Sequence, residues 1–100
     1  MKDQFSVIVS KRAIFDPDLS LKAKGLFAIM SGVADGQSEF SIQIVESLCK
    51  EGTTAFRASV HELTDRGYIE HYRKRNNGQL AQAVYTICPD PTSKDGGEHG

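Results

Sequence analysis

The fold is decided by the stretch TTAFRASVHELTDRGYIEHYRKRNNGQ, residues 53–79, where the spacing of apolar residues changes from helical to strand-like. In its first part, Phe56, Val60 and Leu63 follow one another at steps of four and three residues, which predicts a helix with one buried face. Gly67 is expected to end this helix in the left-handed conformation that glycine adopts without strain. Strands are therefore predicted to follow directly on a helix.

Two strands are predicted after this helix, over residues 68–75 and 79–87. They flank Asn76-Asn77-Gly78, and Asn-Gly is a strong hairpin signal because both central turn residues need a positive φ. Pro89 and Pro91 end the second strand, since proline has no N–H to donate to a strand ladder. The pattern predicts a β-hairpin.

Two further helices are predicted upstream. Ser20 is expected to cap a helix over residues 21–34, whose buried face carries Ala23, Leu26, Phe27 and Met30. Ser41 is expected to cap a short helix that stops at residues 50–52, with inward residues Ile42, Val45, Leu48 and Cys49. The next helix then begins almost at once, capped by Thr53 or Thr54, and a glycine in so short a connection is typical of a helix-turn-helix.

The N-terminal segment shows a period of two. Phe5, Val7 and Val9 alternate with other residues, which predicts a short strand at a sheet edge, and Asp16-Pro17-Asp18 then breaks the chain. The expected fold class is α+β: a winged helix-turn-helix with a three-helix core, an N-terminal strand and a C-terminal β-hairpin wing. We expect this domain to span residues 1–91 and residues 92–100 to be a disordered polar linker or tail.

Composition excludes several classes of protein. The chain has 100 residues, of which 39% are hydrophobic and 25% charged, as in ordinary globular domains. Its longest apolar run, residues 26–30, is far shorter than the roughly 20 residues of a membrane span. The N-terminus also lacks the apolar core of a secretory signal, so we expect a cytoplasmic chain with no membrane partner. Cys49 and Cys88 lack the spacing of a zinc site or disulfide framework and are expected to be free core residues.

Charge is distributed unevenly along the chain. The formal net charge is −1, yet residues 57–75 carry five basic and three acidic side chains. The exposed face of the helix in this segment is the first candidate nucleic-acid surface, because such a face enters the major groove in helix-turn-helix proteins. Arginine can contact guanine or phosphate, and threonine suits phosphate. The candidate residues are Thr53, Thr54, Arg57, Ala58 and His61.

Two considerations oppose this interpretation of the helix. Asp65 shares the exposed face and would repel phosphate, and together with Glu62 it is expected to neutralise Arg57 and Arg66 in part. Arginine and threonine on an exposed helix face are also often only solvated. The helix therefore has a functional and a purely structural interpretation.

The hairpin turn is the second candidate surface. Its basic and amide residues are Arg73, Lys74, Arg75, Asn76, Asn77 and Gln79. Wings of this composition lie along the phosphate backbone or enter the minor groove. The alternative is that these charges protect the hairpin against pairing with the edge of another sheet.

Catalytic signatures do not occur in the sequence. His61, His71 and His99 form no H-E-x-x-H pattern, and there is no P-loop, G-x-S-x-G or G-x-G-x-x-G motif. We therefore expect a protein that is not an enzyme and that has no cofactor and no metal.

Several segments resemble one family. LSLKAKGL (residues 19–26), EGTTAFR (51–57), ELTDRGYI (62–69), NGQ (77–79) and YTI (85–87) are similar to the N-terminal winged-helix domain of phage and mobile-element replication proteins, the replisome-organiser and DnaD-like proteins. The resemblance covers roughly residues 5–91. It implies a DNA-binding or oligomerising module that opens a longer protein and recruits replication machinery. Family members often carry a tryptophan after the first helix, and we expect Phe40 to take over its packing here.

Two classes of function follow. In the first, the domain binds double-stranded DNA, with the third helix in the major groove and the basic wing on the backbone. In the second, the same fold is a protein-interaction module in which residues 5–10 and 21–34 build a homodimer or bind replication proteins. A small transcriptional regulator is a further alternative. The basic wing favours DNA binding, whereas the net charge of −1 favours protein interaction.

Overall fold

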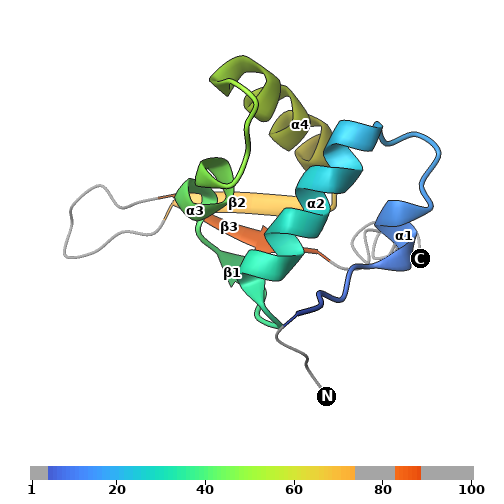
Figure 1. Cartoon of the computed structure of the whole chain (residues 1–100), viewed down its shortest axis with the longest axis horizontal. Helices are drawn as coiled ribbons and strands as arrows, with labels where there is room; N and C mark the ends of the chain where they lie inside the picture. Colours follow the sequence, from blue (N-terminus) through green and yellow to red (C-terminus); the bar gives the residue numbers. More distant parts are fainter. Residues whose placement is uncertain (1–4, 74–82, 89–100) are drawn as a thin grey trace.

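Helices precede a β-hairpin in the computed structural model, which describes residues 5–73 and 83–88. Within these residues the helices are α1 (Lys11–Ile14), α2 (Leu21–Ala34), α3 (Ile42–Ser47) and α4 (Thr53–Asp65) (Figure 1). The strands are β1 (Glu39–Phe40), β2 (Ile69–Arg73) and β3 (Ala83–Ile87). The protein is an α+β protein, as its sequence predicts.

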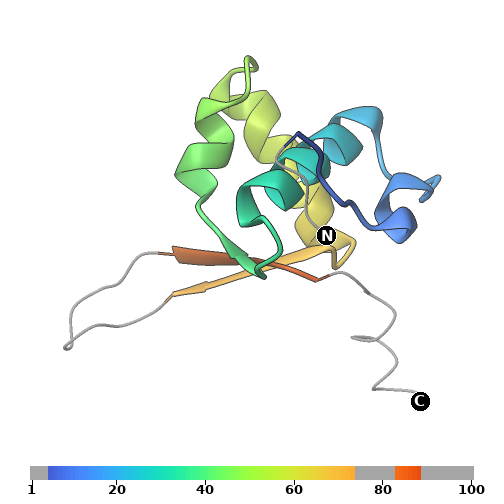
Figure 2. The same ribbon diagram turned by 60° about the horizontal axis from the view of Figure 1, so that its bottom comes forward.

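The three strands form one antiparallel sheet in the order β1-β3-β2. The helices lie on one face of this sheet, as Figure 2 shows. β2 and β3 pair from Ile69 opposite Ile87 to Arg73 opposite Ala83, which confirms the predicted antiparallel pair. The predicted turn Asn76-Asn77-Gly78 and the tail over 92–100 lie outside the described residues.

Three predicted helix signals are confirmed. The Ser20 hydroxyl accepts a hydrogen bond from the Ala23 N–H at 3.1 Å, and the Ser41 hydroxyl accepts one from the Ile44 N–H at 3.2 Å. Each bond satisfies one of the N–H groups that the first turn of a helix leaves without an internal partner. Gly67 follows the C-cap of α4 with a φ of 84°, the left-handed conformation expected there.

Two details of the helix predictions are wrong. The N-cap of α4 is Gly52, with no side-chain hydrogen bond, so Thr53 is already the first residue of the helix. Leu48 is 61% exposed rather than directed inward. Val45 and Cys49 are four residues apart and share the inward face, whereas Leu48 lies on the flank that turns away from the core.

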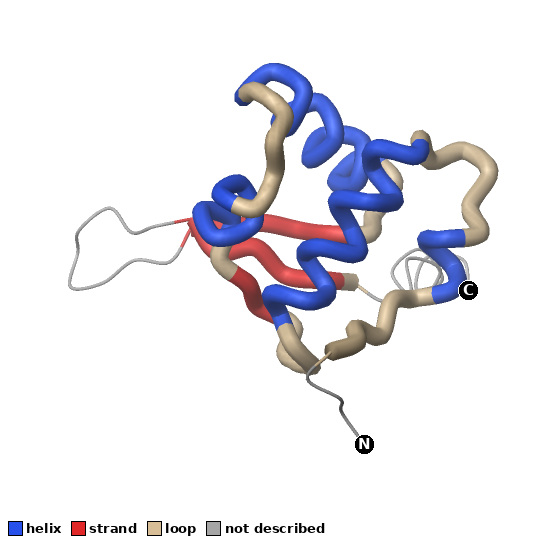
Figure 3. The backbone as a smooth tube through the Cα atoms, in the orientation of Figure 1, coloured by secondary structure: helices blue, strands red, loops and turns tan. Residues whose placement is uncertain are grey.

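The predicted N-terminal strand is also wrong. Residues 6–10 run along the protein as a loop, and the short helix α1 follows (Figure 3). Val7 contacts α2 at Gly32, and Val9 packs on the core, whereas Ile8 between them is 84% exposed. Phe5 is 86% exposed, so only the Val7–Val9 part of the alternation reflects an extended segment lying against a helix. The edge of the sheet beside β3 is occupied by β1 instead.

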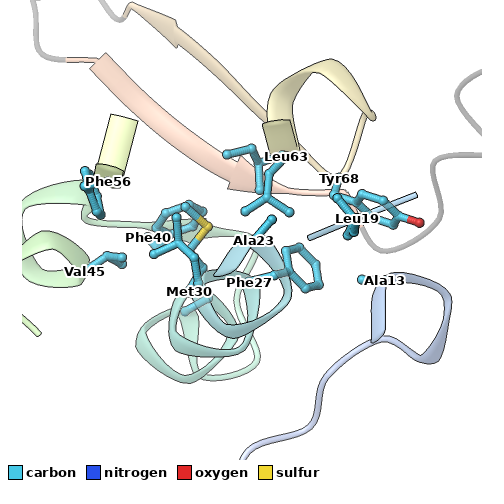
Figure 4. Packing of buried hydrophobic residues seen from close by; sticks show 13 residues of the cluster. Ala13, Leu19, Ala23, Phe27, Met30, Phe40, Val45, Phe56, Leu63 and Tyr68 are labelled. Atoms are coloured by element: carbon cyan, nitrogen blue, oxygen red, sulfur yellow. The ribbon is translucent and has the colours of Figure 1, made fainter. Parts of the chain in front are cut away.

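The core lies between α2 and the helix-facing side of the sheet. The inward face of α2 is buried as predicted, and in Figure 4 its side chains point toward Leu63 and Tyr68. The rings of Phe27 and Tyr68 meet edge to face, with centroids 5.7 Å apart. Phe40 is also buried, which agrees with the packing role expected for it. The core residues are Ala13, Leu19, Ala23, Leu26, Phe27, Met30, Ala34, Phe40, Val45, Phe56, Leu63, Tyr68 and Ile69.

Truncation of Leu63 tests this core. Leu63 is fully buried, so Leu63→Ala should lower the free energy of unfolding by about 2–5 kcal/mol, through lost apolar contact and the cavity left behind. Leu48→Ala removes the same atoms from an exposed site and should change that free energy by less than about 0.5 kcal/mol. Denaturant unfolding measures both. Equal losses in the two variants would contradict the placement of Leu63.

Candidate nucleic-acid interface

The orientation of α4 is fixed by its contact with the N-terminus of α2. The Glu62 carboxylate accepts one hydrogen bond from the Ser20 backbone N–H at 2.6 Å and another from the Ser20 hydroxyl at 2.8 Å. Both hydrogen bonds, that from the Ser20 N–H more than that from its hydroxyl, hold the pKa of Glu62 below its ordinary value, because they favour the charged carboxylate. Glu62 therefore serves the fold.

A second carboxylate, Asp16, anchors the end of α4 to the loop before α2. It accepts hydrogen bonds from the Tyr68 hydroxyl at 2.7 Å, the Arg66 guanidinium at 3.0 Å and the Asp18 N–H at 2.9 Å. These bonds, that of Tyr68 above all, lower the pKa of Asp16. Burial, helped by the bond to Asp16, raises the pKa of Tyr68 to about 12. Arg66 is thus paired with Asp16 and, more distantly, with Asp18 at 3.7 Å.

These contacts change the expected charge balance of α4. The acids of α4 are expected to neutralise Arg57 and Arg66 in part, and the charge of Arg66 does contribute to the lowered pKa of Glu62. The Glu62 carboxylate is also hydrogen-bonded to Ser20, however, and Asp65 lies 3.3 Å from the Nε2 atom of His61. Arg57 forms no ion pair within the ranges that the structure describes. The guanidinium nearest the start of α4 is therefore available to an anion.

The candidate residues of α4 lie at the surface. Thr53, Thr54, Arg57, Ala58 and His61 are all exposed, and so is Arg73 at the end of β2. The other candidate wing residues, Lys74, Arg75, Asn76, Asn77 and Gln79, lie outside the described residues.

A groove of about 350 Å³ between α3, α4 and the sheet brings two of these candidates together with residues that the sequence did not single out. Arg57, His61 and Thr64 line it from α4, at spacings that place them along one side of the helix. His71 and Tyr85 line the opposite wall, on β2 and β3. Thr53, Thr54, Ala58 and Arg73 do not line this groove. The remaining lining residues are Ile42, Glu46, Phe56 and Val60.

Aromatic rings support the sheet wall of the groove. The imidazole of His71 lies over the ring of Tyr85, with centroids 5.1 Å apart and planes inclined by 31°. Tyr85 in turn packs against Phe40 at 6.0 Å. The three residues occupy paired positions across β2, β3 and β1, so they form one row on the side of the sheet that faces the helices. An exposed histidine is therefore connected through ring contacts to the buried core.

The alternation of β2 could have identified His71 from the sequence. Ile69 is apolar and buried, so the residues two and four positions later, His71 and Arg73, share its side of the strand. Glu70 and Tyr72 then belong to the outer face, where the Tyr72 hydroxyl donates a hydrogen bond to Glu39 at 3.2 Å. Tyr85 and Glu46 carry no comparable signal, since their place in the groove depends on the packing of distant elements.

Neither a metal centre nor a membrane span is found in the described part of the chain. Among residues 5–73 and 83–88, no group of three or more histidine, cysteine, aspartate or glutamate side chains is arranged to hold a metal ion. No helix in these ranges has both the length and the apolar composition that crossing a membrane requires. Cys49 and Cys88 form no disulfide with each other and are both half-buried, and burial raises the pKa of the Cys49 thiol.

Comparison with known proteins gives no assignment: no protein-family model matches the sequence, and neither a curated protein nor a solved structure matches it.

Loss of the Asp16 carboxylate tests the anchor of α4. A carboxyl group whose pKa is lowered by folding stabilises the protein above its unfolded pKa of about 3.9, and this contribution is lost as the pH falls through the folded-state pKa. Asp16→Asn should therefore lower the free energy of unfolding by about 1–2 kcal/mol at pH 7, and by progressively less below about pH 4.

The matched control is Asp18→Asn, which removes the same charge two residues away at an exposed site. It should change the free energy of unfolding by less than about 0.5 kcal/mol at either pH. Urea unfolding at several pH values measures both variants. An Asp16→Asn penalty that stays constant from pH 7 to pH 3 would contradict the proposed role of the carboxylate.

Proposed function

We propose that the chain is a DNA-binding winged helix-turn-helix domain of a replication-initiation or replisome-organiser-like protein. The observation that carries this proposal is the arrangement around α4. α3 and α4 form consecutive helices joined by residues 48–52, and a β-hairpin follows α4 directly. In a winged helix, the second helix of such a pair enters the major groove and the hairpin contacts the flanking backbone.

The charges near the start of α4 support the proposal. Arg57 is exposed, without an ion pair in the described ranges, and lies within the first two turns of α4, where helix-turn-helix proteins contact base edges. Thr53 and Thr54 lie in the first turn, where hydroxyls and free backbone N–H groups suit phosphate. Glu62 stays a charged carboxylate, but its hydrogen bonds to Ser20 hold it on the side of α4 that contacts the N-terminus of α2.

The replication role is supported by the sequence resemblance alone. The motifs LSLKAKGL and ELTDRGYI form, respectively, the N-terminal half of α2 with its cap and the junction of α4 with β2. A small transcriptional regulator uses the same fold, so the proposal takes replication from the resemblance and DNA binding from the geometry of α4.

Binding of the whole chain to a fluorescently labelled random duplex tests the proposal. With roughly four to six phosphate contacts, the affinity should fall by two to three orders of magnitude between about 50 and 200 mM salt, because each contact releases counterions. Arg57→Ala should weaken binding about tenfold. Replacing Arg73, Lys74 and Arg75 together by alanine should remove most of the affinity and flatten the salt dependence.

Lys11→Ala is the matched control, since α1 and the end of β2, where Arg73 is the last residue, lie on opposite sides of the molecule (Figure 1). It should change the affinity less than about twofold. A wing variant that binds as tightly as the unmodified chain would refute the wing assignment. Absence of binding at 50 mM salt would refute the DNA-binding function itself.

A second candidate function, self-association, is favoured by exposed apolar side chains near the N-terminus. Phe5 and Ile8 are 86% and 84% exposed, and Phe15 and Leu21 are exposed as well. Large exposed apolar side chains on a small domain can mark an interaction surface. Such a surface is compatible with DNA binding, because many helix-turn-helix proteins bind two half-sites as dimers.

Light scattering tests the self-association. The chain should have a mass near twice 11.0 kDa, and replacing Phe5 and Ile8 together by serine should restore the monomer. Ile44→Ser, which alters an exposed apolar residue of α3, should leave the dimer intact. A monomer at the highest soluble concentration of the unmodified chain would exclude the homodimer.

A further inference from the structure

We propose that the groove between α3, α4 and the sheet holds one backbone phosphate of the bound DNA, and that His61 and His71 make this contact stronger as the pH falls. The inference rests on the proposed DNA-binding function and assigns a ligand to a groove that the sequence motifs do not describe. Its ligand is the phosphodiester group, and its residues are Arg57, His61 and His71.

The walls of the groove present donors from two elements. Arg57 and His61 are one helical turn apart on α4, and His71 faces them from β2. A guanidinium and two imidazolium groups are the side chains that form charge-assisted hydrogen bonds with phosphate oxygens. Thr64 also lines the groove, but its hydroxyl donates its hydrogen to the Val60 carbonyl at 2.9 Å.

The charge of this region depends on the two histidines. Glu46 lines the groove from α3, and Asp65 lies beside His61, so with neutral imidazoles these two acids outweigh Arg57. Protonation of both histidines changes the balance from one net negative charge to one net positive charge. A phosphate should therefore be repelled while the two imidazoles are neutral and held once they are protonated.

The surroundings of the two histidines also suit a contact with phosphate. His61 is 75% exposed, and its Nε2 atom lies 3.3 Å from Asp65, so protonation converts this contact into an ion pair. His71 is exposed but oriented by its ring contact with Tyr85. Asp65 therefore stabilises the positive charge of His61, and the ring contact with Tyr85 holds His71 in position at the groove.

The experiment measures binding of the full chain to the random duplex at pH 6 and pH 8, at constant ionic strength. The unmodified chain should bind about tenfold more tightly at pH 6, the gain expected from a hydrogen bond to a charged group. His61→Gln with His71→Gln should reduce this ratio to about twofold or less. At pH 6 the affinity of the double variant should also depend less steeply on salt concentration, by the amount expected for the loss of about one phosphate contact.

His99→Gln is the matched control. It removes the third histidine of the chain, which lies in the C-terminal segment, and it should keep the full tenfold ratio. Glu46→Gln provides a second, independent variant: loss of the acid from the groove should strengthen binding at both pH values. Unchanged thermal unfolding of each variant shows that the fold is intact.

The outcomes separate the two proposals. Tight binding whose pH ratio survives in the double histidine variant would overturn the groove and leave DNA binding standing. Absence of binding at both pH values would overturn DNA binding, and the groove with it. Inorganic phosphate at matched ionic strength gives a further test, because it should compete with the duplex for the groove of the unmodified chain but not for that of the double histidine variant. Equal displacement of the duplex from both proteins would overturn the groove as the phosphate site.

Discussion

The carboxylate of Glu62 on the N-terminus of α2 is the contact on which the position of α4 depends. In a capping box, the acid that returns to the N-cap N–H comes from the third residue of the same helix. α2 has Ala23 at that position, and Glu62 supplies the carboxylate from another helix. The cap of α2 and the orientation of α4 are therefore completed by one interaction. Because Gly67 turns the chain into β2 directly after α4, the same contact also sets where the hairpin begins.

Asp16 has a corresponding role just beyond the C-terminal end of α4. It binds Tyr68 and Arg66, which lie on either side of Gly67, and so ties the junction of α4 and β2 to the loop before α2. Two acids and one arginine are thereby committed to the fold at the C-terminal half of α4. The N-terminal half keeps an arginine outside this network. The two halves of α4 therefore differ: the C-terminal half is bound into the fold, and the N-terminal half carries an exposed arginine that has no ion pair in the described ranges.

Local signals in the sequence were sufficient for much of the fold. The serine caps of α2 and α3, the left-handed Gly67 and the pairing of β2 with β3 all depend on residues close together in the chain. The N-terminal strand was wrong because a period of two also arises where an extended segment lies on a helix. β1 has only two residues and no period to detect. The contact between Glu62 and Ser20 joins residues 42 positions apart, and no local pattern reports it.

The net charge of −1 is a poor guide to the surface that an anion would meet. Glu39 and Glu70 lie on the outer face of the sheet, Asp16 lies in the loop before α2, and the two groove histidines count as neutral in that sum. The groove is distinguished by how its side chains are positioned rather than by its total charge. The ring of His71 rests on Tyr85, and Tyr85 rests on Phe40 in the core, so the imidazole is held in place by the packing that stabilises the sheet. A side chain oriented in this way loses little conformational freedom when it contacts a phosphate, because its place was already fixed by folding.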